Sequence, residues 1–256
     1  MLTRRQLRQL HGDDVPMHIL EQDYVESVLL KGIYHATDIL VLKGGTCLRK
    51  AYGLNRFSED LDFSLRAGII DGDQVRTAMA GGLEGMEKSA MTARLKDWKE
   101  RGNTFLCKVS YEGPLYTGQE ISRGNMEIEI SRSSPFEPPD WKTIITEYPD
   151  TGTFSIQCMR SAEMLAEKFR TLGQRRKPRD LYDVWFLMRT GVRTDIDAVN
   201  RKLAEVCVDD ADSLGEIVGA YRVTEKEWAR DLEVLIGRLP DLADIHKDLE
   251  ELLGEG

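Results

Sequence analysis

Apolar residues follow helical and strand periods along the chain, and their pattern changes near residue 160. Residues 17–36 place apolar side chains at helical spacing, among them Ile19, Leu20, Tyr24 and Val28, which predicts a long amphipathic helix. A continuous apolar run over 39–42 predicts a buried strand, and a short helix is expected over 47–52. The alternation over 61–65 predicts a second strand.

The remaining pattern separates a mixed half from a helical half. Residues 72–90 predict a helix weakened by glycines, and strands are expected over 92–98, 104–111, 125–131 and 154–159. Later residues show only helical spacing, with helices expected over 162–172, 178–190, 195–207, 212–221, 224–237 and 241–253. The predicted fold class is α+β: a domain with a mixed sheet and flanking helices over 1–159, then an all-α bundle over 160–256.

Composition narrows the class of protein. The chain has 256 residues, with 35 Lys and Arg against 44 Asp and Glu, a formal charge of −9. This balance excludes a strongly basic coat for nucleic acid, although a local basic patch is compatible with it. No apolar stretch predicts a membrane span, and the N-terminal residues do not resemble a secretory signal.

The cysteines indicate the compartment. They are widely spaced, without a metal-binding pattern, and each is expected to be free and buried: Cys47, Cys107, Cys158 and Cys207. A reducing, cytoplasmic location fits this usage, and no membrane partner is expected.

The first candidate motif joins Gly44-Gly45-Thr46 to Asp60-Leu61-Asp62. Two glycines at the end of a strand let a phosphate approach the N–H groups of the following helix, although a plain tight turn has the same pattern. Asp60 and Asp62 share one face of a strand, and two neighbouring carboxylates favour a cation such as Mg²⁺ between them. A solvated strand end is the alternative interpretation.

A second pair of acids, Glu127 and Glu129, alternates with apolar residues on a later strand. A third carboxylate beside Asp60 and Asp62 would complete a two-metal site for phosphoryl transfer. The same alternation is typical of a solvent-exposed strand face, so both interpretations stay open.

The helical half contributes Lys168 and two acids. Lys168 lies next to an apolar stripe and could hold a phosphate, or it could extend into solvent from the helix flank. Asp180 falls in the first turn of the next helix, where the helix dipole alone could explain it. Asp183, one turn later, adjoins the apolar face and is expected to form an ion pair or act as a base.

Taken in order, these motifs resemble the AbiEii/AbiGii-type nucleotidyltransferase toxins, which belong to the DNA-polymerase-β-like nucleotidyltransferase superfamily. The resemblance lies in GGT, then 13 residues, then DLDF, followed by a carboxylate strand, EKF-R and KPRDLYDVWFL. It implies that the N-terminal sheet is nucleotidyltransferase-like. It also implies a transfer of a nucleoside monophosphate from a nucleoside triphosphate to an acceptor hydroxyl.

The resemblance also implies a role for each matching residue. Gly44, Gly45 and Thr46 would hold the triphosphate, and Arg56 and Ser58 would lie near the phosphates or the metal. Asp60 and Asp62 would bind Mg²⁺ and take part in catalysis with Lys168 and Asp183. Glu129 falls where relatives commonly have Asp, so Glu127 and Glu129 both stay candidates for the third ligand. All these side chains are expected to converge on one cleft between the two halves.

The family further suggests the 3′ end of transfer RNA as acceptor and a cognate antitoxin as partner. A basic cluster could contact the RNA backbone, or it could be a solvated loop: Arg170, Arg175, Arg176, Lys177 and Arg179. Two alternatives remain open at this point. One is a small-molecule nucleotidyltransferase of the antibiotic-modifying kind, and the other is a non-catalytic module that binds RNA or protein on the same fold.

Overall fold

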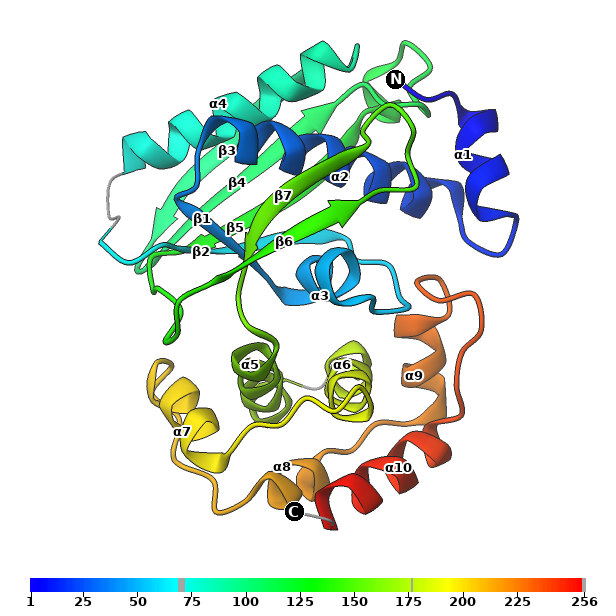
Figure 1. Cartoon of the computed structure of the whole chain (residues 1–256). Helices are drawn as coiled ribbons and strands as arrows, with labels where there is room; N and C mark the ends of the chain where they lie inside the picture. Colours follow the sequence, from blue (N-terminus) through cyan, green and yellow to red (C-terminus); the bar gives the residue numbers. More distant parts are fainter. Residues whose placement is uncertain (69–71, 176, 255–256) are drawn as a thin grey trace. The chain divides into compact units, whose positions relative to one another are not determined.

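The computed structural model describes residues 1–68, 72–175 and 177–254 (Figure 1). The chain divides into two compact units, the first formed by Met1–Gly53 and Phe57–Met159, the second by Leu54–Arg56 and Arg160–Gly256. The three residues Leu54–Arg56 follow the helix α3 (Gly44–Tyr52) in sequence but belong to the second unit.

A mixed sheet of seven strands in the described residues forms the centre of the first unit, in the order β3-β4-β5-β2-β1-β7-β6. The pairs β2–β5 and β1–β7 are parallel, and the other four pairs are antiparallel. The strand bounds are β1 Leu40–Lys43, β2 Asp60–Leu65, β3 Ala93–Arg101, β4 Thr104–Tyr111, β5 Gly124–Ser131, β6 Asp140–Ile145 and β7 Thr153–Cys158. The predicted α+β class is confirmed.

Helices α2 (Met17–Ala36) and α4 (Gly72–Lys88) pack side by side in the first unit (Figure 1). Their backbones touch at glycines: a Cβ added to Gly32 would lie 2.7 Å from the Gly81 carbonyl oxygen, and one added to Gly85 would lie 2.7 Å from the Gly32 Cα. The glycines that weaken the helical propensity of 72–90 therefore allow a close helix–helix contact.

Helix α2 differs from the predicted amphipathic helix, although its bounds are those expected. Thirteen of its 20 residues are buried, and these include the acids Glu21, Asp23 and Glu26. The reason is tertiary: α2 packs against α1 (Arg4–His11), α4 and β7, so little of its surface faces solvent.

Three elements were not expected from the sequence: α1, β6 and the short 3-10 helix η1 (Glu120–Ser122). Helix α1 begins with a capping box between Thr3 and Gln6. Strand β6 directly follows prolines, and its apolar residues do not alternate. Among the cysteines, three are buried as expected, whereas Cys207 is exposed in the turn after α7 (Ile196–Ala204).

The second unit is helical, and its two central helices are α5 (Ser161–Gln174) and α6 (Pro178–Arg189) (Figure 1). Helix α5 packs against α7 and α8 (Leu214–Ala220), and α6 packs against α9 (Glu225–Leu232) and α10 (Leu242–Gly254). All six helices expected after residue 160 are present, with Pro178 in the first turn of α6. No helix in the described ranges combines the length and apolar character needed to cross a membrane.

Candidate active site

The start of α3 is packed tightly against β2. Gly44 has φ of 69°, and a Cβ at this position would overlap the Asp62 carboxylate. The buried Thr46 hydroxyl donates a hydrogen bond of 2.6 Å to the Asp60 carbonyl oxygen. The Gly-Gly-Thr turn therefore directly holds the strand that carries Asp60 and Asp62, and the Thr46 hydroxyl is part of that contact.

Four carboxylates lie along one face of the β2–β5 pair. The parallel register places Asp60 opposite Glu127 and Asp62 opposite Glu129. The intervening residues of both strands are buried, whereas Asp60, Glu127 and Glu129 are exposed and Asp62 is half-buried. Because neighbouring strands are about 4.8 Å apart, these like charges repel unless a cation lies near them.

The two glutamates have different surroundings. Glu127 forms an ion pair of 2.5 Å with Lys108, which already supplies a cation for its carboxylate. Glu129 is the direct neighbour of the half-buried Asp62. Glu129 is favoured as a further ligand because its neighbour Asp62 is the carboxylate that packs against the Gly44 turn, whereas Glu127 lies opposite Asp60.

The donor set suits Mg²⁺. Within the residues that the structure describes, no three His, Cys, Asp or Glu side chains are placed to hold a metal ion by themselves. Mg²⁺ is usually bound by one or two carboxylates together with substrate phosphates. Asp60 and Asp62 would therefore supply the ligands that the protein contributes, and the phosphates would supply the others.

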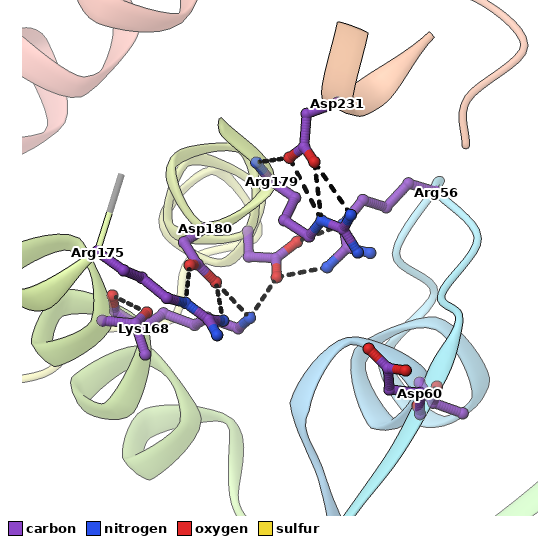
Figure 2. Close-up of polar contacts among 10 residues, drawn as sticks. Arg56, Asp60, Lys168, Arg175, Arg179, Asp180 and Asp231 are labelled. Atoms are coloured by element: carbon purple, nitrogen blue, oxygen red, sulfur yellow. Dashed lines mark hydrogen bonds and ion pairs between the residues drawn. The ribbon is translucent and has the colours of Figure 1, made fainter. Parts of the chain in front are cut away.

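In the second unit, Lys168 of α5 is buried between two carboxylates of α6 (Figure 2). Its Nζ lies 3.0 Å from Asp180 Oδ1 and 2.7 Å from Asp183 Oδ2. Both acids are 0% exposed, so Lys168 does not extend into solvent and Asp180 is more than a helix-dipole residue. The interpretation of Lys168 as a solvated flank residue is wrong.

These contacts fix the protonation states. Burial alone would lower the pKa of Lys168, but Asp183 and Asp180 outweigh burial and raise it. Burial likewise opposes ionisation of Asp180, but Lys168 and Arg175 outweigh it and hold the Asp180 pKa well below its usual range. Lys168 is therefore a cation and Asp180 an anion at neutral pH.

Arg56 and Asp183 form a buried, bidentate ion pair. Arg56 Nε and Nη2 donate to Asp183 Oδ1 and Oδ2 at 2.8 and 2.7 Å, and Arg56 is 1% exposed. Asp183 thus joins Arg56 to Lys168. The expected position of Arg56 near phosphates stays a prediction, as does that of Ser58, which is buried just before β2.

Most of the basic cluster contacts acids of its own unit. Arg175 pairs with Asp180 at 2.8 Å, Arg179 with Asp231 at 3.0 Å, and Arg170 with Glu167 at 3.6 Å. Lys177 is exposed, and Arg176 lies outside the described residues. The RNA contact predicted for this cluster stays a prediction, and so does the convergence of all site residues on one cleft.

The sequence interpretation missed a buried charge cluster in the first unit. Asp23 accepts hydrogen bonds of 2.5 Å from Arg49 and Tyr148, and it pairs with Lys50 at 2.7 Å. One turn along α2, neither carboxylate oxygen of the buried Glu26 has a hydrogen-bond partner among the described residues. The sequence feature that could have indicated this cluster is the presence of three acids, Glu21, Asp23 and Glu26, among the apolar residues of α2.

The comparisons with known proteins agree with this architecture. The sequence profile described as "Nucleotidyl transferase AbiEii toxin, Type IV TA system" matches residues 29–255. Among curated proteins, no sequence matches significantly.

Two solved structures show the same fold. MenT4, a nucleotidyltransferase toxin from Mycobacterium tuberculosis H37Rv, aligns with a TM-score of 0.70 and 21% identity over 99% of this chain and 89% of that chain. JHP933 from Helicobacter pylori aligns with a TM-score of 0.59 and 20% identity over 94% of this chain and 92% of that chain. Since the family profile covers most of the sequence, this chain is a nucleotidyltransferase that belongs to the AbiEii toxin family of type IV toxin–antitoxin systems.

Proposed function

We propose that this nucleotidyltransferase moves a nucleoside monophosphate from a nucleoside triphosphate to an acceptor hydroxyl, with Mg²⁺ as the metal and pyrophosphate as the leaving group. The observation that carries the proposal is the packing of the Gly44 turn against Asp62, which brings a helix N-terminus and a carboxylate pair together. A helix N-terminus favours phosphate, and paired carboxylates favour Mg²⁺, so the two features suit one metal–triphosphate ligand.

Each residue has a defined task in this proposal. Asp60 and Asp62 would hold the metal together with phosphate oxygens of the substrate, and Glu129 is the proposed further ligand; the bound metal would neutralise charge on the phosphates. The N–H groups at Gly44, Gly45 and Thr46 bind phosphate oxygens. Lys168 binds phosphate as a cation, and Asp183 fixes both Lys168 and Arg56, as supported by the ion pairs in the second unit. The acceptor oxygen bonds to the α-phosphorus while the bond to pyrophosphate breaks.

We assign the nucleotidyltransferase role to residues 1–159 and treat 160–256 as a helical domain that supplies Lys168. The proposed acceptor is the 3′ end of transfer RNA, in the cytoplasm, and a cognate antitoxin counters the activity. Support for an RNA acceptor comes from the family and from Arg175, whose side chain is 48% exposed despite its contact with Asp180. An RNA-binding role predicts that affinity falls steeply with salt and with Arg175→Glu.

The proposal is tested by incubating the protein with Mg²⁺, total transfer RNA and each triphosphate labelled at the α-phosphate. Label on RNA with the wild type, absent with the Asp60→Ala/Asp62→Ala variant, supports both the reaction and the acceptor. Label on protein would refute the RNA acceptor while retaining the chemistry. Label on RNA with the double variant as well would refute the metal-binding role of the two aspartates.

A further inference from the structure

Asp180 and Asp183, the two carboxylates that hold Lys168, lie in the first turns of α6. We infer that Asp231 of α9 is a positioning residue for this end of α6, and through it for Lys168. The inference rests on the proposed role of Lys168 in triphosphate binding.

The N-terminus of α6 has no cap from its own sequence. The N-cap residue Lys177 makes no side-chain capping hydrogen bond, and Pro178 has no N–H to donate. The next N–H, that of Arg179, donates to Asp231 Oδ2 at 3.0 Å. Asp231 therefore acts as an N-cap supplied by a helix 52 residues away in the sequence.

A second contact fixes the same carboxylate (Figure 2). The guanidinium of Arg179 donates from Nη2 to Asp231 Oδ1 at 3.0 Å, so side chain and backbone of one residue bind one carboxylate. Burial opposes ionisation of Asp231, but the hydrogen bonds and charge of Arg179 outweigh it and lower its pKa. An anion at this position is also favoured by the positive end of the helix dipole.

The capped residue, Arg179, is the direct sequence neighbour of Asp180, which binds Lys168. Asp180 follows Arg179 directly, and its carboxylate binds both Lys168 and Arg175. A shift of the first turn of α6 would therefore move Asp180 relative to Lys168. Asp231 thus acts through Arg179 and Asp180, without itself contacting Lys168 in this scheme.

The opposite end of α6 offers a matched control. Asp248 of α10 accepts hydrogen bonds from Trp185 Nε1 at 2.8 Å and from Arg189 Nη1 at 3.1 Å. Asp248 therefore also ties α6 to a C-terminal helix, but through Trp185 and Arg189, which lie in later turns than Asp180. Loss of either aspartate loosens α6, and only loss of Asp231 is expected to disturb Lys168.

The experiment compares Asp231→Ala, Asp231→Asn and Asp248→Ala in the full chain. Titration with a non-transferable triphosphate analogue and Mg²⁺ gives the Kd, and thermal unfolding gives the stability of each variant. We expect Asp231→Ala to weaken binding about tenfold to a hundredfold, as misplacement of a site residue does. Asp231→Asn can still accept a hydrogen bond from the Arg179 N–H, so its Kd is expected to lie between those of the wild type and Asp231→Ala. The Kd of Asp248→Ala is expected to stay within about twofold of the wild-type value. Equal Kd values for Asp231→Ala and Asp248→Ala at matched Tm would overturn the inference.

A second readout does not depend on the nucleotide. Nuclear magnetic resonance of ¹³Cε-labelled lysine follows the titration of Lys168, assigned with Lys168→Arg. We expect Asp231→Ala and Asp231→Asn to lower the pKa of Lys168 relative to the wild type, while Asp248→Ala leaves it unchanged. An unchanged Lys168 titration in both Asp231 variants would overturn the inference. A wild type that binds no triphosphate, but shows this pKa pattern, would refute the proposed function alone.

Discussion

Gly44 and Asp62 are in direct contact, because the Asp62 carboxylate occupies the space in which a side chain at position 44 would lie. Gly44 also has a left-handed backbone, with φ of 69°. The close approach of the first turn of α3 to the carboxylate strand therefore depends on a residue without a Cβ.

Gly44→Ala is expected to abolish transfer and to lower stability by more than backbone strain alone, which is about 1–2 kcal/mol for an L-residue in this region. The control is Gly53→Ala: Gly53 has φ of 77°, but a Cβ there would meet nothing within 4 Å. Denaturant unfolding and a transfer assay on both variants check the prediction. Retention of full activity by Gly44→Ala would show that the position of Asp62 does not matter.

Asp183→Asn is expected to lower the free energy of unfolding by about 3–5 kcal/mol, because it leaves Arg56 and Lys168 buried beside a neutral group. Both ion pairs are short and shielded from solvent. Asp248→Asn weakens a more exposed contact and should cost at most about 1 kcal/mol. Urea unfolding at neutral pH compares the two, and similar losses would contradict the central place of Asp183 in the network.

Glu26→Gln is expected to change how stability depends on pH. Burial raises the pKa of Glu26 well above its usual value, so the folded state binds this proton more tightly than the unfolded state. Stability should therefore decline as pH rises above the unfolded pKa, with a slope of up to about 1.4 kcal/mol per pH unit from this one group. Unfolding of wild type and variant between pH 5 and pH 8 checks this. Parallel curves for the two proteins would contradict it.

Glu129→Gln is expected to reduce transfer and to weaken its dependence on Mg²⁺, whereas Glu127→Gln keeps both near wild type. The physical reason is that Glu129 lies opposite Asp62, the carboxylate in contact with the Gly44 turn, whereas Glu127 lies opposite Asp60. Glu127 forms an ion pair with Lys108. A Mg²⁺ titration of the transfer rate compares the two variants, and a greater loss with Glu127→Gln would reverse the assignment.

Local patterns were sufficient for most elements of the fold. A strand was expected over 104–111 and helical spacing predicted a helix over 17–36, and β4 and α2 have these bounds. The burial of α2 on nearly all sides could not be predicted, because it depends on which elements surround it. Strand β6 was missed because it has no alternation of its own and gains its hydrogen bonds from β7.

The candidate site shows the same limit. The spacing of Asp60 and Asp62 predicts a shared face, but only the register of β2 with β5 shows that Glu129 lies opposite Asp62 and Glu127 opposite Asp60. Likewise, Lys168 and Asp183 were selected from the sequence, while the pairing of Asp183 with Arg56 required a contact across 127 residues. Nothing in the sequence pointed to Asp231, since acids are common in amphipathic helices such as α9.

The central claim is the transfer of a nucleoside monophosphate, and the position of the transferred phosphorus tests it most directly. Parallel reactions would use one triphosphate labelled at the α-phosphate or at the γ-phosphate, with wild type and Asp62→Asn. For the wild type, the account predicts that the α label joins the acceptor and that the γ label leaves in pyrophosphate. With Asp62→Asn, neither product is expected to form. Transfer of the γ label to the acceptor, or unchanged transfer by Asp62→Asn, would contradict it.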